Sequence, residues 1–317
     1  MKILHAADLH LDSTFTGRSP HQAARLKEAM NKIPRQLAAL CKAEGCDLAL
    51  LAGDLFDGPW NRDSFQELYT ALEEIQVPVF ISPGNHDFIA HDSPYWSEVW
   101  PENVHIFTRP EMESVALPEL NCRVYGAGYR SMDCDALLEN FRAEGEEQYH
   151  IAVLHGDPTT TQSPYSPIST NQLRRSGLHY AALGHVHKGG QLRAGQTLCA
   201  WPGCPMGRGF DELDAKGVLI VTLDETVRAD FVALDTPRFF DYDGAFMRFL
   251  QNVVDLIFLN ILFIVGCLPV LTIGGSLLAL YEVSLSHTRY GRSKVIFKEF
   301  WHSYKRHLKS GLLLTVI

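Results

Sequence analysis

Five short motifs carry polar side chains that can bind divalent metal ions. In chain order they are Asp8-Leu9-His10, Gly53-Asp54-Leu55-Phe56-Asp57, Gly84-Asn85-His86-Asp87, His155-Gly156 and Gly184-His185-Val186-His187. Imidazole, carboxylate and amide oxygen together suit intermediate divalent ions such as manganese, iron or zinc. The motifs contain no cysteine, which argues against a structural zinc site. The mixture therefore predicts a catalytic metal centre.

The candidate ligands are too numerous for a single tetrahedral ion. They are Asp8, His10, Asp54, Asn85, His155, His185 and His187. Such a set suits two ions that share a bridging carboxylate. Two ions about 3.5–4 Å apart can hold a hydroxide between them and clamp a phosphoryl group for in-line attack. The set predicts phosphoester hydrolysis, and it leaves His86 and Asp57 for other roles.

The spacing within the motifs predicts how the backbone presents the ligands. In D-x-H and H-x-H, an extended segment would place two ligands on one side and turn the middle residue away. A glycine before Asp54, Asn85 and His185 would let the backbone turn sharply and approach the ions.

Each motif follows a short apolar run that reads as a buried strand. The runs are Ile3–Ala7, Leu48–Ala52, Val79–Ser82, Ile151–Leu154 and Ala181–Leu183, and helical patterns over Gln22–Ala43, interrupted by Pro34, and Arg62–Ile75 lie between them. Ligands of α/β sheets bind outside the carboxyl ends of the strands, so the motifs should meet there. Three later runs are expected to form a closing antiparallel set: Thr197–Trp201, Gly217–Leu223 and Arg228–Leu234.

Charge is divided unevenly along the chain. The formal net charge is −9, yet residues 239–317 hold 8 Lys/Arg and 5 Asp/Glu. The preceding part is therefore strongly acidic, which excludes broad sequence-independent binding of nucleic acid but leaves room for a small basic groove. The 7 cysteines are irregularly spaced, as in a cytosolic protein with reduced thiols. No secretory signal is visible at the start, so the catalytic part is expected in the cytoplasm.

The composition changes after Pro237. No charged residue occurs between Asp255 and Glu282. An uncharged stretch of that length is long enough to cross a bilayer as a helix. Basic residues follow the stretch and favour the cytoplasmic side, so a hairpin that turns at Pro269 is preferred to a single span. The sequence predicts a cytoplasmic catalytic domain attached to the cell membrane by its tail.

The ordered motifs resemble those of the calcineurin-like metallophosphoesterases. Within that family, "KILHAADLHLDS", "LRRSGLHYAALGHVHKGG" and "WPGCPMGRGFDE" resemble bacterial DNA-repair exonucleases of the SbcD and YhaO type. The resemblance covers about residues 1–236 and implies an α/β fold, a four-layer αββα sandwich. Residues 239–317 resemble the beginning of YesL-type membrane proteins. We therefore expect a phosphoesterase domain over 1–236 and an incomplete, α-helical transmembrane segment over 237–317, joined by a gene fusion or an assembly artefact.

The resemblance also implies individual roles. Asp8, His10 and His187 would bind one ion, Asn85, His155 and His185 would bind the second, and Asp54 would bridge them. His86 would act on the leaving oxygen as a general acid or electrostatic stabiliser, with Asp57 orienting it. The family implies two divalent ions, Mn²⁺ first and Fe or Zn as alternatives.

Two substrate classes remain open. The subgroup motifs favour DNA, with an SbcC-like ATPase as partner and a homodimer as the assembly. The acidic charge and the membrane tail favour a phosphodiesterase or pyrophosphatase for a small nucleotide or a lipid-linked substrate. Asp12, Asp87 and His91 lie beside the ligands and are candidate supporting residues, while Arg130 and Arg208 are candidates to meet a phosphate.

Overall fold

The computed structural model describes residues 1–209, 212–213, 215–238, 245–267, 272–290 and 296–316. The chain divides into two compact units, Met1–Phe240 and Asp241–Ile317.

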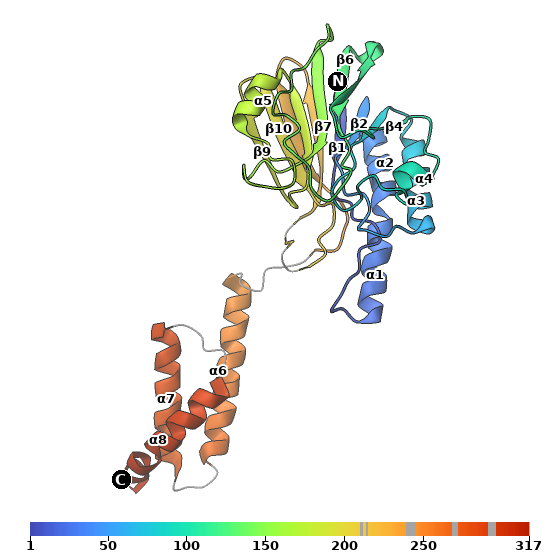
Figure 1. The fold of residues 1–317 in the computed structure, drawn as a ribbon. Helices are drawn as coiled ribbons and strands as arrows, with labels where there is room; N and C mark the ends of the chain where they lie inside the picture. Colours follow the sequence, from blue (N-terminus) through green and yellow to red (C-terminus); the bar gives the residue numbers. More distant parts are fainter. Residues whose placement is uncertain (210–211, 214, 239–244, 268–271, 291–295, 317) are drawn as a thin grey trace. The chain divides into compact units, whose positions relative to one another are not determined.

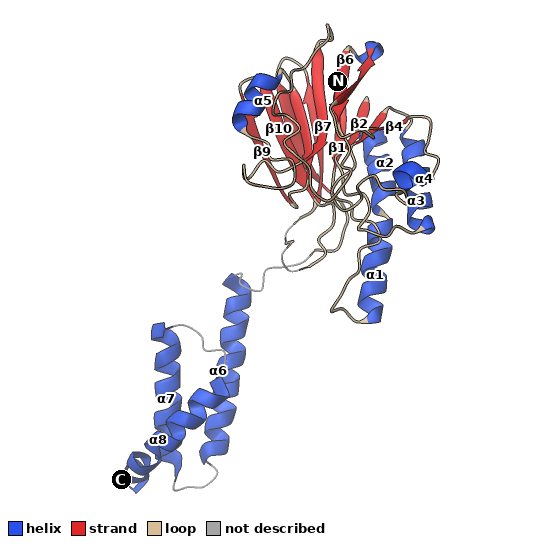
Figure 2. Cartoon of the chain, in the orientation of Figure 1, coloured by secondary structure: helices blue, strands red, loops and turns tan. Residues whose placement is uncertain are grey.

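The first unit contains two mixed six-stranded sheets that face each other (Figures 1 and 2). The first sheet has the order β12-β11-β1-β2-β3-β4. Its strands are β1 (Lys2–Ala6), β2 (Leu48–Leu51), β3 (Val79–Ile81), β4 (Val104–Ile106), β11 (Gly217–Leu223) and β12 (Val227–Ala233). β1 to β4 run parallel, whereas β11 is antiparallel to both β1 and β12.

The second sheet has the order β5-β6-β7-β8-β10-β9. Its strands are β5 (Glu113–Leu117), β6 (Cys122–Gly126), β7 (Tyr149–His155), β8 (Tyr180–Gly184), β9 (Lys188–Ala194) and β10 (Thr197–Gly203). The predicted closing set of three strands is wrong in one member. β10 pairs with β8 and β9 in this sheet, while β11 and β12 complete the first sheet. The tight turn at Gly195, with φ 65°, folds β10 back on β9 and fixes this pairing.

Helices cover the outer faces. α1 (Pro20–Asn31), α2 (Ile33–Glu44), α3 (Arg62–Ile75) and the short α4 (Pro94–Ser97) follow strands of the first sheet, and α5 (Thr170–Ser176) follows β7. A 3₁₀ turn, Pro118–Leu120, joins β5 to β6. The predicted interruption at Pro34 is confirmed: proline is tolerated in the first turn of α2, so one helix ends at Asn31 and the next begins at Ile33.

Three apolar clusters define the layers. α2 and α3 pack on the outer face of the first sheet through residues such as Leu37 and Leu68. Ile3, Leu50 and Val153 belong to the cluster between the sheets. α5 adds Leu173 to the cluster on the outer face of the second sheet, which loops also cover. The fold is thus an α/β sandwich of two mixed sheets between outer helices and loops.

The second unit contains α6 (Ala245–Cys267), α7 (Ile273–Tyr290) and α8 (Ile296–Val316). The uncharged stretch is divided between α6 and α7, and the predicted turn at Pro269 lies outside the described residues. Among the helices that are described, none is both long enough and apolar enough to cross a bilayer. The transmembrane prediction is therefore unconfirmed.

Candidate dinuclear metal centre

The predicted ligands meet at the carboxyl ends of parallel strands. The loops that follow β1, β2 and β3 leave neighbouring strands of the first sheet, and His155 ends β7 beside β8 in the second. Two backbone hydrogen bonds tie the first two loops together, from Asp8 N to Gly53 O at 3.0 Å and from His10 N to Asp54 O at 2.9 Å. Across the sheets, the backbone N–H of His185 donates to Asp8 Oδ1 at 3.0 Å.

The backbone at these loops differs from the extended geometry expected of D-x-H and H-x-H. Asp8, His10, Asp54 and His185 have φ of 53°, 47°, 50° and 95°, in the left-handed region. This conformation is uncommon for residues other than glycine and costs of the order of 1–3 kcal/mol per residue. The alternation prediction is therefore wrong. The chain instead turns at these four residues, and hydrogen bonds between the loops hold the turns at Asp8, His10 and His185.

Asp8, His10 and His187 form the first group of donors. One ligand atom from each lies within 4.8 Å of the others. The Nε2 atoms of His10 and His187 are 3.0 Å apart. His187 Nδ1 lies 2.5 Å from Glu212 Oε1, so Nδ1 carries the proton and Nε2 presents its lone pair in the neutral ring. The structure thus brings together the three residues predicted to bind the first ion.

Asn85, His155 and His185 form the second group. Asn85 Oδ1 lies 2.8 Å from His155 Nε2 and 3.2 Å from His185 Nδ1. His155 Nδ1 donates to the carbonyl of Ala52 at 3.0 Å, which directs the lone pair of Nε2 toward Asn85. Burial lowers the pKa of His185 to about 4, so its ring is neutral and able to bind a metal at neutral pH.

Asp54 lies between the two groups. Its Oδ2 is 3.8 Å from His10 Nε2 and 3.4 Å from His155 Nε2. Burial by itself would raise the pKa of Asp54, but His155, His10 and His86 hold the pKa below its ordinary value. An ionised carboxylate at this position is the donor that the two groups would share.

The donor set fits two cations better than it fits protons. His10 Nδ1 is buried and has no hydrogen-bond partner among the described residues. In the second group, His155 donates from Nδ1 to the carbonyl of Ala52, so its Nε2 lone pair faces the Asn85 oxygen at 2.8 Å. Two acceptors at this distance repel each other unless a cation lies between them. Seven oxygen and nitrogen donors in two linked groups therefore fit the two ions that the sequence predicts.

His86 differs from the seven ligand candidates in its surroundings. Its Nδ1 lies 2.8 Å from Asp57 Oδ1, and its side chain is 40% exposed. His10, in contrast, has 1% exposure, and burial lowers its pKa. The hydrogen bond that His86 donates to Asp57 raises the pKa of His86. An exposed histidine whose protonated form is stabilised can meet a substrate and donate a proton to it.

Asp57 is ionised and held by more than one neighbour. Nearby His10, followed by the hydrogen bond from His86, holds the pKa of Asp57 well below its usual range. His10 Nδ1 is 3.6 Å from Asp57 Oδ1, so its influence is electrostatic rather than that of a formed hydrogen bond. The Ser13 hydroxyl also donates to Asp57 Oδ2.

Glu212 is a residue that the motif reasoning missed. Burial alone would raise its pKa, but hydrogen bonds from His187 and Arg208 hold the pKa of Glu212 well below its usual value. A carboxylate on the outer nitrogen of a metal-binding histidine fixes its tautomer and orientation. The "GFDE" letters contribute to the family resemblance, but nothing in them indicates which histidine Glu212 contacts.

Arg208 joins the two carboxylates. Its Nη1 lies 3.3 Å from Asp57 Oδ2, and its Nη2 lies 3.2 Å from Glu212 Oε1. The side chain therefore links the partner of His86 to the partner of His187. Arg130, also predicted as a candidate to meet a phosphate, is exposed and contacts the carbonyl of Thr108 at 3.5 Å, so it has no described contact with the donor groups.

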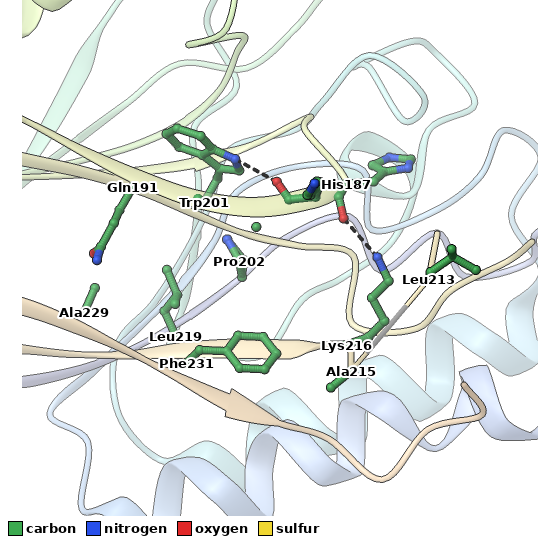
Figure 3. A pocket seen from close by; sticks show the side chains of 13 residues that line it. His187, Gln191, Trp201, Pro202, Leu213, Ala215, Lys216, Leu219, Ala229 and Phe231 are labelled. Atoms are coloured by element: carbon green, nitrogen blue, oxygen red, sulfur yellow. Dashed lines mark hydrogen bonds between the residues drawn. The ribbon is translucent and has the colours of Figure 1, made fainter. Parts of the chain in front are cut away.

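The backbone of His187 is also fixed. Lys216 Nζ donates to the His187 carbonyl at 3.2 Å, and Cys204 N donates to it at 3.4 Å. Figure 3 shows the lysine reaching this carbonyl beside a pocket of about 360 Å³, which Trp201 and Phe231 also line. The H-x-H segment is thus anchored at its second histidine through both side chain and main chain.

Asp87 supports the loops without joining the donor groups. It accepts hydrogen bonds from Leu55 N at 2.6 Å, Gly84 N at 2.8 Å and Tyr95 Oη at 2.5 Å. It thereby ties the loop after β2 to the loop after β3. Asp12 instead accepts from Asn61 N at 2.9 Å at the start of α3, and His91 is exposed.

Close packing explains two of the motif glycines. A Cβ atom at Gly53, whose φ is 84°, would collide with the ring of His155, and one at Gly84 would collide with the carboxylate of Asp54. The glycines therefore make room for the side chains of His155 and Asp54. The sequence had instead predicted that they let the backbone approach the ions.

The fold is an α/β sandwich, and its strand ends bring together two linked groups of carboxylate, imidazole and amide donors. This combination is typical of dinuclear metallohydrolases. The calcineurin-like phosphoesterase family matches residues 1–189, and the chain belongs to this family. Members of this family are phosphoesterases that bind two divalent metal ions. The separate family described as "Protein of unknown function, DUF624" matches residues 256–317.

Two bacterial relatives each match 70% of the chain. The uncharacterized metallophosphoesterase YhaO of Bacillus subtilis is 35% identical over 239 residues, which are 57% of YhaO. The SbcD component of the nuclease SbcCD of the same species is 26% identical over 266 residues, which are 66% of that component. This chain therefore spans less than two thirds of either relative. A dimetal phosphatase from Danio rerio superposes with a TM-score of 0.46 and 13% identity, over 72% of this chain and 95% of that one.

Proposed function

We propose that this chain hydrolyses phosphodiesters with two divalent metal ions, Mn²⁺ being the proposed native metal. The observation that carries the proposal is the convergence of six donors, in two groups of three, about Asp54. Asp8, His10 and His187 are assigned to one ion, and Asn85, His155 and His185 to the other. Two such ions supply an activated hydroxide and neutralise charge on the phosphoryl group when they are bound.

The remaining chemistry is assigned to the chain's own side chains. His86, exposed and protonated through Asp57, is proposed to donate a proton from Nε2 to the leaving oxygen, because Nδ1 is engaged by the carboxylate at 2.8 Å. Asp57 keeps the ring in that orientation. Glu212 and Arg208 are proposed as positioning residues that hold His187 and Asp57.

The test uses the full chain and an activated diester. Bis-p-nitrophenyl phosphate should be cleaved in the presence of Mn²⁺, and excess chelator should stop the reaction. Asp54→Asn should remove most activity, because the amide cannot replace a bridging carboxylate. Asp133→Asn, an exposed acidic residue, is the matched control and should retain activity. Full activity in chelator or in Asp54→Asn would overturn the proposal.

For the substrate we propose DNA, degraded by a nuclease of the DNA-repair exonuclease type. The support comes from the subgroup motifs and from the similarity to the SbcD component of the nuclease SbcCD. An SbcC-like ATPase as partner and a homodimer as the assembly belong to the same proposal. Linear DNA should be shortened with little sequence preference, and a circular control of the same length should persist.

A second substrate class is favoured by a separate observation. The part of the chain before residue 239 is strongly acidic, which opposes binding of a polyanion. A small nucleotide or lipid-linked phosphodiester or pyrophosphate would not meet this barrier to the same extent. Cleavage of such compounds with no cleavage of DNA would select this alternative.

For the tail we propose contact with the cytoplasmic face of the cell membrane. α6 exposes several large apolar side chains, among them Phe258, Ile261, Ile264 and Val265. Exposed apolar surface on this scale marks a site of interaction. The full chain should float with liposomes, and Ile261→Glu/Ile264→Glu should remain in the aqueous fraction. Equal flotation of both proteins would contradict the proposal.

A further inference from the structure

Basic residues are concentrated at one place in an otherwise acidic unit. Residues 18–36, which include α1, hold five Lys/Arg and one Asp/Glu. Lys27 is paired with Asp12 at 3.6 Å, and Arg35 with Glu67 at 2.7 Å. The other three basic residues, Arg18, Arg25 and Lys32, line a single hollow.

This hollow has a volume of about 540 Å³ and lies against α1. Arg18, Arg25, Lys32 and Arg238 line it together with two acidic side chains, Glu28 and Asp235. The lining therefore has an excess of positive charge. Lys32 and Glu28 form an ion pair at 2.7 Å. Arg25 and Lys32 are seven residues apart, which places them on one face of the chain about 10 Å from each other.

A second hollow shares Arg18 with this one and lies beside the metal centre. It has a volume of about 490 Å³ and is lined by the loop from Ser13 to Arg18, with Asp57, Arg208 and Glu212 at its other side. Arg18 lines both hollows. Asp57 contacts the candidate general acid, so the second hollow begins beside the reacting groups. Each hollow has the volume of an ordinary ligand site, which suits one extended strand rather than a duplex.

We propose that the two hollows form one track, from Arg208 past Arg18 to Arg25, Lys32 and Arg238, that binds the phosphodiester backbone of a single DNA strand leading to the metal centre. The inference rests on the proposed phosphodiester hydrolase function, because it concerns how a polymer reaches that centre. It also offers a polyanionic substrate a local excess of positive charge within an acidic domain, because four basic and two acidic side chains line the first hollow. A small substrate would occupy the centre without reaching Arg25 or Arg238.

The experiment measures binding separately from cleavage. The full chain is titrated with a fluorescent single-stranded oligonucleotide whose linkages are phosphorothioates, at several salt concentrations, and anisotropy gives the affinity. The test variant is Arg25→Glu/Arg238→Glu. The matched control is Arg174→Glu/Arg175→Glu, which makes the same charge change on exposed residues of α5, beside the other sheet. Metal content and the unfolding temperature verify that each variant is intact.

The test variant should lose about tenfold or more in affinity, while the control loses about threefold at most through net charge alone. For two lost phosphate contacts, the slope of log affinity against log salt should become shallower by about 1.4. Equal losses in both variants, or no binding by the unaltered chain, would overturn the track. If Arg25→Glu/Arg238→Glu loses binding to phosphatidylglycerol vesicles but binds DNA as the unaltered chain does, the hollow binds lipid instead. Failure of diester hydrolysis alongside a selective loss of DNA binding would refute the proposed function and leave the track standing.

Discussion

His86 Nδ1 and Asp57 Oδ1 lie 2.8 Å apart. This contact with a carboxylate distinguishes His86, the proposed proton donor, from the histidines proposed as metal ligands. The two residues come from loops after neighbouring parallel strands, β3 and β2. Hydrogen bonding raises the pKa of His86, whereas burial lowers the pKa of His10 and of His185. The surroundings therefore favour the protonated form of His86 and the neutral form of His10 and His185, although all three lie in one small region.

Replacing a proton donor and replacing a ligand should have different consequences. His86→Ala should lower turnover about 10²–10⁴-fold, the usual contribution of a positioned general acid, and keep both ions. His185→Ala should lose one ion, because its ring belongs to the second group of donors. Elemental analysis counts the metals, and His91→Ala, an exposed histidine nearby, is the control. If His86→Ala loses an ion while His185→Ala keeps both, the assignment is reversed.

Asp57→Asn should impair the reaction without emptying the site. The amide still fills the space but no longer stabilises protonated His86, so we expect turnover to fall about 10–100-fold, as for other residues that orient a functional histidine. The Michaelis constant for the diester should change little. Metal content that drops by one ion in Asp57→Asn would show that Asp57 acts as a ligand instead.

Glu212→Gln tests whether this carboxylate positions His187. The substitution weakens the contact to Nδ1, which is 2.5 Å long, and leaves the ring free to change its tautomer. Metal affinity should fall about 10–100-fold, measured by competition with a chelator. Glu119→Gln, on an exposed residue of the 3₁₀ turn, is the control. Unchanged affinity in Glu212→Gln would mean that the donor groups are fixed without it.

The sequence was sufficient to locate the strands that carry the ligand motifs, but it did not predict β9 or the pairing of β10. Apolar runs bounded by Gly-Asp or Gly-Asn located β2 and β3 to within one residue, because a buried parallel strand has little choice of residue type. β9, in contrast, has the sequence KGGQLRA, and all but its last residue are exposed or half-buried, so no apolar run indicated it. β10 was expected beside the wrong neighbours because a strand's partners depend on long-range pairing that its own residues do not record.

The same limit applies to the site. Each ligand motif is local in sequence, so it could be read directly. Glu212 lies 25 residues after His187, and Arg208 lies 151 residues after Asp57, so these contacts arise only when the sheets pack. The left-handed φ values at Asp8 and His10 were also hidden, because they are imposed by hydrogen bonds from one loop to the next rather than by the residues themselves.

His5 makes the stability of the metal-free protein depend on pH. It is fully buried, its Nδ1 lies 2.7 Å from the Tyr180 hydroxyl, and its Nε2 donates to the Leu183 carbonyl at 3.1 Å. The contacts join β1 of one sheet to β8 of the other. Burial lowers the pKa of His5 to about 3, from an unfolded value of about 6.5. Between these values the unfolded chain binds the proton and the folded chain does not.

The sign of the effect follows from this difference in proton binding. Stability from the neutral ring is present above pH 6.5 and is lost as the pH falls toward 3. From pH 6.5 to pH 5, His5 should therefore lower the free energy of unfolding by about 1.5 kcal/mol. His5→Gln removes this dependence, although losing the ring costs stability at neutral pH. Urea unfolding in chelator, followed by intrinsic fluorescence, should show the gap between unaltered protein and variant narrowing by that amount over this range. A gap that stays constant would show that His5 titrates alike in both states.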